Sequence, residues 1–488
     1  MADWKAALKN LKKQPGESPA PANPGIADLG AAVQASREPP SAPPARYLCL
    51  GLDFGTSSTK AVIRVLPSGP AFAIAFCGGN GGTNTYLAPT RLWIGNDGGA
   101  CLEAATVGGW VEEMKVRLMQ GPWAREAAVT GMDIKARPAD LAAAYLGLLI
   151  RRILEWSKTN VLPSLGGARI VWSLNMGIPA RDFDAKEIYE AFLAVARAGW
   201  HLANTDAAID LGGAAKAVDA ARDYTLRPSG IEMDMIGVVP EVAAGVASYA
   251  RSQLRREGAH LFVDVGATTF DSSIFLLQQS GDGELKYVFL SADVDSELGA
   301  LRLHRHRARE IGRLALAQFA AAEPLKPIPT TAQECIPPKG AVENVDAEFA
   351  ERCTIKLGAV IARAKNKAPP ELSVPEHGPP GSMQVILSGG GVHLPLYRNV
   401  IEESGRRAAP GGRQGFRVKP FQTMQVPSPQ DLRGPVMTPA DWQRLEVAYG
   451  LSFQIDDIGD FVPPSALSNP PPLPRRDPGS EFITNDQM

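Results

Sequence analysis

The chain has 488 residues, of which 45% are hydrophobic and 21% charged, an ordinary composition for a folded protein of roughly two to four domain-sized units. Its 50 basic and 52 acidic residues leave a net charge of −2, which argues against a generally basic nucleic-acid-binding protein. We expect no transmembrane helix and no secretory signal, because no apolar run is long enough for either. Five widely spaced cysteines fit a protein of the reducing cytoplasm, not a disulfide framework or a zinc site.

The two ends of the chain differ from its middle. Residues 1–14 hold a predicted short basic helix (residues 2–14) with apolar side chains at i, i+4 and i+7. Residues 15–45 are rich in proline and alanine and predict a disordered linker, and residues 454–488 predict a disordered, proline-rich tail. The basic helix and the tail are candidate docking elements for a protein partner; the alternative is that both are unstructured termini.

Between these ends, strand-like apolar runs alternate with helical stretches. YLCLGLDF, RIVWSLNMGI and HLFVDVG are typical of buried strands, whereas residues 138–156 have apolar side chains at helical spacing and predict a core helix. Such alternation favours an α/β fold with substantial sheets. Near the end, Thr438 and Pro439 predict the start of another helix, and Gly450 its end.

A first glycine-bearing turn lies in residues 48–65, LCLGLDFGTSSTKAVIRV. An apolar strand ends at Asp53, and a second strand follows the turn, so we predict a β-hairpin. Its tip would offer backbone N–H groups and hydroxyls to phosphate oxygens, and Asp53 would face a hydrated Mg²⁺. The turn contains Gly55, Thr56, Ser57 and Ser58. The alternative is an ordinary polar hairpin.

A second turn in residues 260–277, HLFVDVGATTFDSSIFLL, repeats this design. Asp264 ends the apolar strand and Asp271 begins the returning one. The residues between them include Gly266, Ala267, Thr268 and Thr269. Two Asp-Gly-hydroxyl hairpins in one chain suggest two facing lobes around one phosphate chain.

A third turn lies in residues 384–404, where a strand meets three glycines and a helix is predicted from about Pro395. Glycines allow a flat ligand to approach the backbone, and a helix N-terminus favours negative charge. The turn is neither a Walker A loop nor a GxGxxG fingerprint. The glycines are Gly389, Gly390 and Gly391.

In this order, DFGTSSTK, DVGATTFD and LSGGG resemble the two phosphate motifs and the adenosine motif of the actin-like ATPase superfamily, which includes sugar kinases, actin and the DnaK-type heat-shock chaperones. DVGATTFD is most similar to DLGGGTFD of the DnaK branch. The resemblance implies a two-lobed actin-like ATPase fold, each lobe a mixed sheet with flanking helices. Lobe I would span residues 46–240, lobe II residues 241–436, and a helix within 437–453 would return to lobe I.

The resemblance also implies roles for individual residues. Asp53 and Asp264 would hold Mg²⁺ through water, and Lys115 would reach the γ-phosphate; the alternative for Lys115 is a solvated helix lysine. Asp271 would help to position the attacking water. Glu241 lies where the family has a catalytic glutamate, but one position later, which leaves the rate of hydrolysis open.

The same resemblance supplies the expected nucleotide contacts, with Arg363 and Lys365 near the adenine. The full set is Gly55, Thr56, Ser57, Ser58, Gly266, Ala267, Thr268, Thr269, Arg363, Lys365, Gly389, Gly390 and Gly391.

These observations predict an ATP-binding, slowly hydrolysing DnaK-like switch with ATP or ADP and Mg²⁺ as ligands. The chain shows no counterpart of the chaperones' peptide-binding β-sandwich, so we expect it to act through a separate protein. Two alternatives stay open. One is a small-molecule, sugar-type kinase of the same superfamily, and the other is a non-hydrolysing or filament-forming actin-like structural protein.

Overall fold

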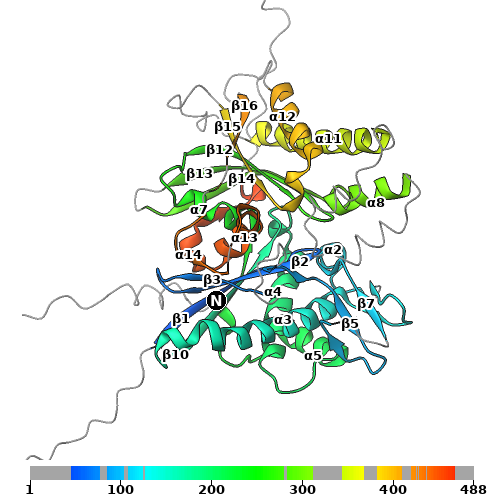
Figure 1. The fold of residues 1–488 in the computed structure, drawn as a ribbon, viewed down its shortest axis with the longest axis vertical. Coiled ribbons are helices and arrows are strands. Elements are labelled where there is room, and N and C mark those ends of the chain that lie inside the picture. The colour runs from blue at the N-terminus through cyan, green and yellow to red at the C-terminus, as the bar shows by residue number, and fades with distance from the viewer. Residues whose placement is uncertain are drawn as a thin grey trace, which may run out of the picture.

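The computed structural model describes residues 45–76, 85–103, 108–124, 127–279, 283–310, 343–367, 382–408, 419–424, 426, 428–435 and 437–467. The predicted basic helix, the predicted linker except its last residue, and the tail beyond residue 467 lie outside these ranges. Within them the chain forms mixed sheets flanked by helices, which confirms the α/β class (Figure 1).

The first large sheet has the strand order β11-β10-β1-β2-β3-β17, with β4 paired to β2 beside this path. β1 is antiparallel to β2 and parallel to β10, and β10 is parallel to β11. The strands are β1 (Ala45–Asp53), β2 (Ser58–Val65), β3 (Ala71–Ala73), β4 (Ala88–Pro89), β10 (Arg169–Ile178), β11 (Ile236–Pro240) and β17 (Leu432–Arg433).

The second large sheet has the order β16-β15-β12-β13-β14-β18. β12 is antiparallel to β13 and parallel to β15, and β15 is parallel to β16. The strands are β12 (Gly258–Val265), β13 (Phe270–Gln279), β14 (Leu285–Asp295), β15 (Ser382–Ser388), β16 (Lys419–Met424) and β18 (Asp460–Val462).

The two sheets share one topology. In chain order, β1, β2, β3, β10 and β11 take the same places and directions as β12, β13, β14, β15 and β16. Each sheet also receives a short late strand parallel to its third strand, β17 beside β3 and β18 beside β14. The two predicted hairpins are confirmed, and they occupy equivalent positions in the two sheets.

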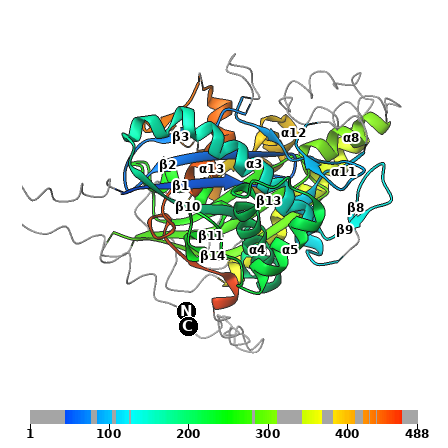
Figure 2. The same ribbon diagram turned by 90° about the horizontal axis from the view of Figure 1, so that it is seen from below.

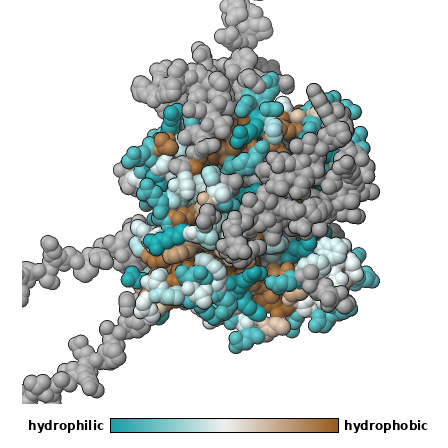
Figure 3. All heavy atoms as spheres, in the orientation of Figure 1, coloured by the Kyte–Doolittle hydropathy of each residue, from teal (hydrophilic) through white to brown (hydrophobic). Residues whose placement is uncertain are grey.

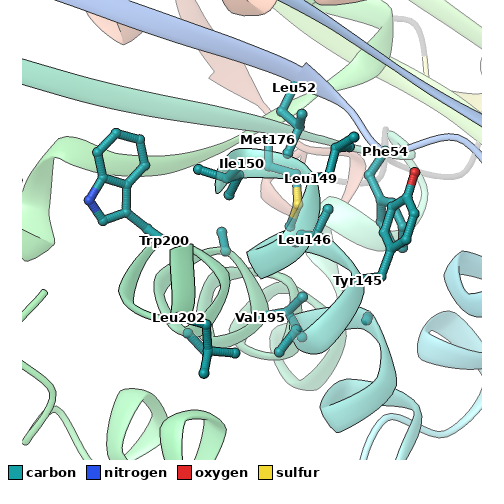
Figure 4. Packing of buried hydrophobic residues seen from close by; sticks show 14 of the residues in the cluster. Leu52, Phe54, Tyr145, Leu146, Leu149, Ile150, Met176, Val195, Trp200 and Leu202 are labelled. Carbon is teal, nitrogen blue, oxygen red and sulfur yellow. The ribbon is translucent and has the colours of Figure 1, made fainter. Parts of the chain in front are cut away.

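Helices cover the first sheet and form its core with it. α3, α4 and α5 lie side by side on one face (Figure 2). Leu149 and Ile150 of α3 point toward Leu52 of β1 and Met176 of β10, and all four side chains are buried (Figure 4). The helices are α2 (Met114–Gln120), α3 (Pro138–Asn160), α4 (Lys186–Ala203) and α5 (Leu211–Arg222), with short 3₁₀ turns at Leu162–Leu165, Asp182–Asp184 and Met233–Met235. The core helix predicted at residues 138–156 is therefore confirmed as α3.

Two small sheets extend this half of the molecule. The three-stranded sheet has the order β6-β5-β7, and the two-stranded sheet pairs β8 with β9. Their strands are β5 (Leu92–Ile94), β6 (Ala100–Cys101), β7 (Gly109–Val111), β8 (Ala127–Ala128) and β9 (Lys135–Ala136).

The second sheet carries its own helices. α11 packs against β13, β14 and α12, and the helix predicted from Pro395 is α12. The elements are α8 (Ala300–Glu310), α11 (Glu343–Lys367), α12 (Pro395–Ala408) and a 3₁₀ turn at Gly390–His393.

A further group of helices lies between the two sheets, with α13 at its centre (Figure 1). α13 begins as predicted, because Thr438 and Asp441 cap each other's backbone N–H groups and Pro439 takes the first helical position. The helices are α6 (Glu241–Gly245), α7 (Ala247–Ala250), α13 (Pro439–Leu451) and α14 (Ile455–Ile458).

The prediction that Gly450 ends α13 is wrong. Gly450 lies inside the helix, and a Cβ there would be 1.9 Å from the carbonyl oxygen of Ala244 in α6. On β1, a Cβ at Gly51 would be 2.3 Å from the carbonyl oxygen of Ala448. Two glycines therefore allow α13 to touch the backbone of α6 and of β1.

The folded body also continues past residue 453, so the prediction of a disordered tail is wrong for the residues that begin it. After α14, strand β18 joins the second sheet, and a 3₁₀ turn follows at Pro464–Ala466. The ring of Phe461 in β18 packs against those of Tyr287 and Phe183. The proline-rich composition predicted that the entropy cost of ordering this segment would keep it unfolded. The ring contacts of Phe461 offset that cost.

The surface visible in Figure 3 mixes hydrophilic and hydrophobic side chains over the described residues. Among the described residues, large exposed hydrophobic side chains are scattered along the chain: Tyr224 follows α5, Leu254 lies between α7 and β12, and Ile355 is in α11. Within the described ranges, no helix has the length and apolar character needed to cross a membrane.

We predict that Gly450→Ala destabilises the protein by about 1–3 kcal/mol, because the added methyl group collides with backbone in α6. The matched control is Gly358→Ala in α11, where a Cβ meets nothing within 4 Å and should be neutral or stabilising. Urea unfolding midpoints measure both. Equal midpoints for the two variants would contradict the proposed contact.

Candidate functional site

A cleft lies between the two large sheets, at the ends of β1 and β12. Its empty space is about 1030 Å³, a volume that includes open solvent. The three glycine-bearing turns contribute residues to its wall, and so do α2, α6, α8 and α13.

Asp53 and Asp264 both line this cleft. Asp53 is the last residue of β1, and Asp264 has the corresponding place near the end of β12. Asp53 Oδ2 forms an ion pair of 3.0 Å with Lys60 Nζ, its neighbour across the hairpin. Burial raises the pKa of Asp264 to about 6, and the charge of Asp53 adds to the rise against the attraction of Lys60.

Lys115 and Glu241 form a buried ion pair in the same cleft, with 2.5 Å between Nζ and Oε1. The alternative of a solvated helix lysine is therefore wrong. Burial works to lower the pKa of Lys115, but the carboxylates of Glu241 and Asp53 outweigh it and raise the pKa. Burial raises the pKa of Glu241 to about 7 although Lys115 opposes the rise.

Glu241 reaches the cleft despite its shifted place in the sequence. It is the first residue of α6, directly after β11. Gly177 at the end of neighbouring β10 leaves room for it, since a Cβ there would be 2.7 Å from Glu241 Cγ.

Asp271 lines the cleft beside Asp264, its cross-strand partner. The Thr269 hydroxyl donates to Asp271 Oδ2 at 3.2 Å, whereas Oδ1 is buried and has no hydrogen-bond partner in the described part of the chain. Burial raises the pKa of Asp271 well above its usual range, and Asp264 raises it further. Oδ1 is therefore available to a ligand or a water molecule.

With every group ionised, the charges of the cleft would not balance. Four carboxylates face three cations: Asp53, Glu241, Asp264 and Asp271 against Lys60, Lys115 and Arg444. A divalent cation would offset this surplus and would oppose the raised carboxyl pKa values. In the described ranges no group of three His, Cys, Asp or Glu side chains is placed to hold a metal. The residues present fit a hydrated Mg²⁺ with few protein contacts, because Mg²⁺ usually keeps several waters.

The first turn is shaped as predicted. A Cβ at Gly55 would lie 2.2 Å from the carbonyl oxygen of Ser58, so the turn requires glycine. Thr56, Ser57 and Ser58 line the cleft with Gly55.

The second turn differs from the prediction in two places. The N–H of Gly266 donates to the carbonyl oxygen of Thr269, so this amide serves the turn and not a phosphate. Thr268 lines a smaller adjoining cavity, whereas Gly266, Ala267 and Thr269 line the cleft.

The third turn brings Gly389 and Gly390 to the cleft, but Gly391 is buried. Gly389 has φ +80°, and a Cβ there would lie 2.1 Å from Asp264 Oδ1. Its lack of a side chain therefore makes room for Asp264. A Cβ at Gly391 would press against Val265 and Ala300, so Gly391 joins the turn to α8 instead of contacting a ligand.

Arg363 and Lys365 are not among the cleft residues, so the structure does not support their predicted adenine contact. Arg363 Nη2 forms an ion pair of 2.9 Å with Asp293, and its Nε donates to Ser291. The helix that carries both, α11, turns its apolar side to the second sheet, and this packing sets where they point.

Several cleft residues were missed. Lys60 and Ser388 belong to the motifs quoted above and could have been found there. Nothing local in the sequence marks Leu87, and the other missed residues lie on α8 and α13, which reach the cleft only through long-range packing. The missed residues are Lys60, Leu87, Leu301, His304, Ser388, Gln443, Arg444 and Val447.

A smaller cavity, whose empty space of about 320 Å³ includes open solvent, adjoins the cleft at Thr56, Ser57 and Leu301. Beside it Glu113 accepts hydrogen bonds from Arg302 at 2.7 Å and from Arg305 at 3.0 Å. Glu113 directly precedes α2, and both arginines belong to α8, so this ion-pair bridge joins the two halves next to the cleft.

A scan against protein-family models finds no match to this chain, and a search of curated proteins finds no relative.

We predict that Lys115→Met lowers the free energy of unfolding by about 3 kcal/mol at pH 8, because it leaves the buried Glu241 carboxylate without its partner. Lys115→Met combined with Glu241→Leu should recover most of the loss. The control is Lys186→Met, which removes an exposed ion pair with Glu190 and should change the free energy of unfolding by less than about 0.5 kcal/mol. Urea unfolding measures all three; similar losses for Lys115 and Lys186 would contradict the prediction.

Stability should also depend on pH through Asp264. Its pKa is 3.8 when unperturbed and about 6 in the folded protein, so between these values the folded state holds a proton that the unfolded chain has released. The free energy of unfolding therefore falls as pH rises through this window and is level above it. The asparagine variant does not titrate. In metal-free buffer, the free energy of unfolding of Asp264→Asn minus that of wild type should therefore increase by roughly 2–3 kcal/mol as the pH rises from 4 to 7. Urea midpoints across this range measure the difference, and a constant difference would refute the assignment.

Proposed function

We infer that this protein binds ATP with Mg²⁺ and hydrolyses it slowly to ADP and phosphate, as a nucleotide-controlled switch with an actin-like, two-lobed fold. The observation that carries this proposal is that Asp53 and Asp264 occupy equivalent ends of equivalent hairpins and face one cleft. The repeated strand order of the two sheets supports the two-lobed interpretation. The order of the three turns in the sequence supports an ATPase within it.

The cleft contains the groups that phosphoryl transfer to water needs. When bound, Mg²⁺ would neutralise charge on the phosphates, with Asp53 and Asp264 holding it through water. Lys115 would orient the terminal phosphate, and Asp271, whose Oδ1 has no hydrogen-bond partner in the described ranges, would accept a hydrogen bond from the attacking water. Buried charges of this kind act strongly because little solvent screens them.

The Lys115–Glu241 pair supports slow turnover. The ion pair with Lys115, at 2.5 Å from Oε1, makes the Glu241 carboxylate a weaker base toward water than a carboxylate released from the lysine. A ligand phosphate near Lys115 would compete for the lysine and release Glu241. Binding of the nucleotide would thus be coupled to assembly of the catalytic groups.

A switch also needs two arrangements of the halves, and the Glu113 bridge to Arg302 and Arg305 is a contact that would differ between them. We propose that the nucleotide state is transmitted to a separate partner protein. The predicted docking elements for it, residues 2–14 and the end of the tail, lie outside the described residues.

The kinase alternative has less support. It requires a free carboxylate base beside an acceptor pocket, and the small adjoining cavity offers Glu112 and Glu113. Both are ion-paired, Glu112 with Arg91 and Glu113 with two arginines, so neither is poised to take a proton. The filament alternative is tested by sedimentation with and without ATP.

We predict that ATP binds to the wild-type protein in the presence of Mg²⁺ and that Asp264→Asn and Asp53→Asn each weaken binding at least about tenfold, since each removes a charge that would hold the cation. Titration calorimetry with and without EDTA measures this. Arg363→Ala is the control and should bind as wild type, because Arg363 is not a cleft residue.

Phosphate release separates hydrolysis from transfer. We expect inorganic phosphate to appear slowly and at a rate that sugars and polyols do not change. Absence of magnesium-dependent ATP binding would refute the proposed function, and a rate that depends on an added hydroxyl compound would favour the kinase.

A further inference from the structure

His304 is a polar side chain that the mechanism above does not use. It belongs to α8 and lines the cleft, yet only 1% of its surface is exposed. Neither Nδ1 nor Nε2 has a hydrogen-bond partner among the residues that the structure describes. A buried imidazole with two unsatisfied nitrogens destabilises the ligand-free protein, so its presence at a cleft wall points to a ligand.

His260 shows how a structural histidine in this protein differs. It is fully buried in β12, but its Nε2 lies 3.0 Å from the Tyr249 hydroxyl and its Nδ1 lies 2.9 Å from the carbonyl oxygen of Gly258. Both nitrogens are satisfied within the protein, whereas those of His304 are not.

The position of His304 relates it to the second and third turns. Ala300 lies four residues earlier on the same side of α8 and donates its N–H to the carbonyl oxygen of Gly266 in the second turn. Its Cβ would be 3.0 Å from a Cβ added to Gly391 in the third turn. His304 therefore continues the wall from the place where those two turns meet. In the proposed complex the phosphates lie at the first two turns, and the nucleoside lies toward the third.

The chemistry of a neutral imidazole narrows the choice of ligand group. Burial lowers the pKa of His304 to about 4, and Arg307 lowers it further while Asp346 opposes, so the ring is neutral near pH 7. A neutral ring has one donor and one acceptor nitrogen. A phosphate group offers only acceptors and would leave one nitrogen unsatisfied, whereas a nucleoside offers amino or hydroxyl donors as well as acceptors.

We propose that His304 is a specificity-determining residue that binds the nucleoside part of the nucleotide, with one ring nitrogen donating a hydrogen bond and the other accepting one. This assignment rests on the proposed function, because it needs a nucleotide in the cleft. It adds a selective contact to a site whose other polar groups recognise phosphate and cation.

The experiment uses the full chain and two probes, Mg²⁺ with ADP and Mg²⁺ with inorganic tripolyphosphate, which lacks the nucleoside. His304→Leu should weaken ADP binding about tenfold or more and leave tripolyphosphate affinity within about twofold of wild type. His304→Gln keeps one donor and one acceptor group, so its ADP affinity should lie between those of wild type and His304→Leu. Titration calorimetry gives all the affinities.

The melting temperature without ligand distinguishes a ligand-binding histidine from a structural one. Replacing the first should raise the melting temperature, and replacing the second should lower it. His304→Leu should raise the melting temperature, because leucine replaces two unsatisfied polar atoms with apolar surface. The matched control, His260→Leu, should lower it, because it removes the nitrogen that accepts the hydroxyl proton of buried Tyr249.

The outcomes are distinct. If wild type binds both probes and His304→Leu binds ADP as tightly as wild type, or loses both probes equally, the assignment of His304 is overturned and the proposed function stands. A lower melting temperature for His304→Leu would also overturn it. If wild type binds neither probe, the proposed function fails and this assignment fails with it.

Discussion

Backbone contact between α13 and the two elements beside it sets the geometry of the cleft. Gly51, where β1 meets α13, is two residues from Asp53, and Gly450 meets α6 at Ala244, three residues from Glu241. The separation between those two carboxylates is thus fixed by main chain packed on main chain, which rearranges less readily than flexible side chains. The same helix gives Gln443, Arg444 and Val447 to the wall of the cleft.

The ligand-free cleft is an unfavourable arrangement that the rest of the fold maintains. Buried carboxyl groups have raised pKa values because burial disfavours their charge and they repel one another, and one oxygen of Asp271 and both nitrogens of His304 have no partner in the described ranges. Proteins retain such groups where a bound ligand satisfies them, and the extensive cores on both sheets supply the stability that this requires.

The sequence predicted what depends on neighbours along the chain. The Asp-Gly-hydroxyl patterns located both hairpins, and the Thr-Pro-x-Asp pattern located the start of α13, because turns and caps are short-range features. The sequence did not predict which distant helices line the cleft. Arg444 and His304 were therefore missed, and Arg363 was wrongly assigned to the site. It also failed where tertiary contacts override composition, as at Gly450, which serves close packing and not a helix end, and in β18, whose Phe461 anchors a segment that its prolines made appear unstructured.

The late strands carry a consequence for how the protein is made. β17 completes the first sheet, α13 fills the space between the sheets, and β18 then completes the second, all within residues 432–462. On the ribosome, the first sheet therefore cannot be completed when its other strands have emerged, because β17 and α13 are synthesised after most of the second sheet. Both halves must wait with an open edge, where chaperones or premature association would act, and they close almost together.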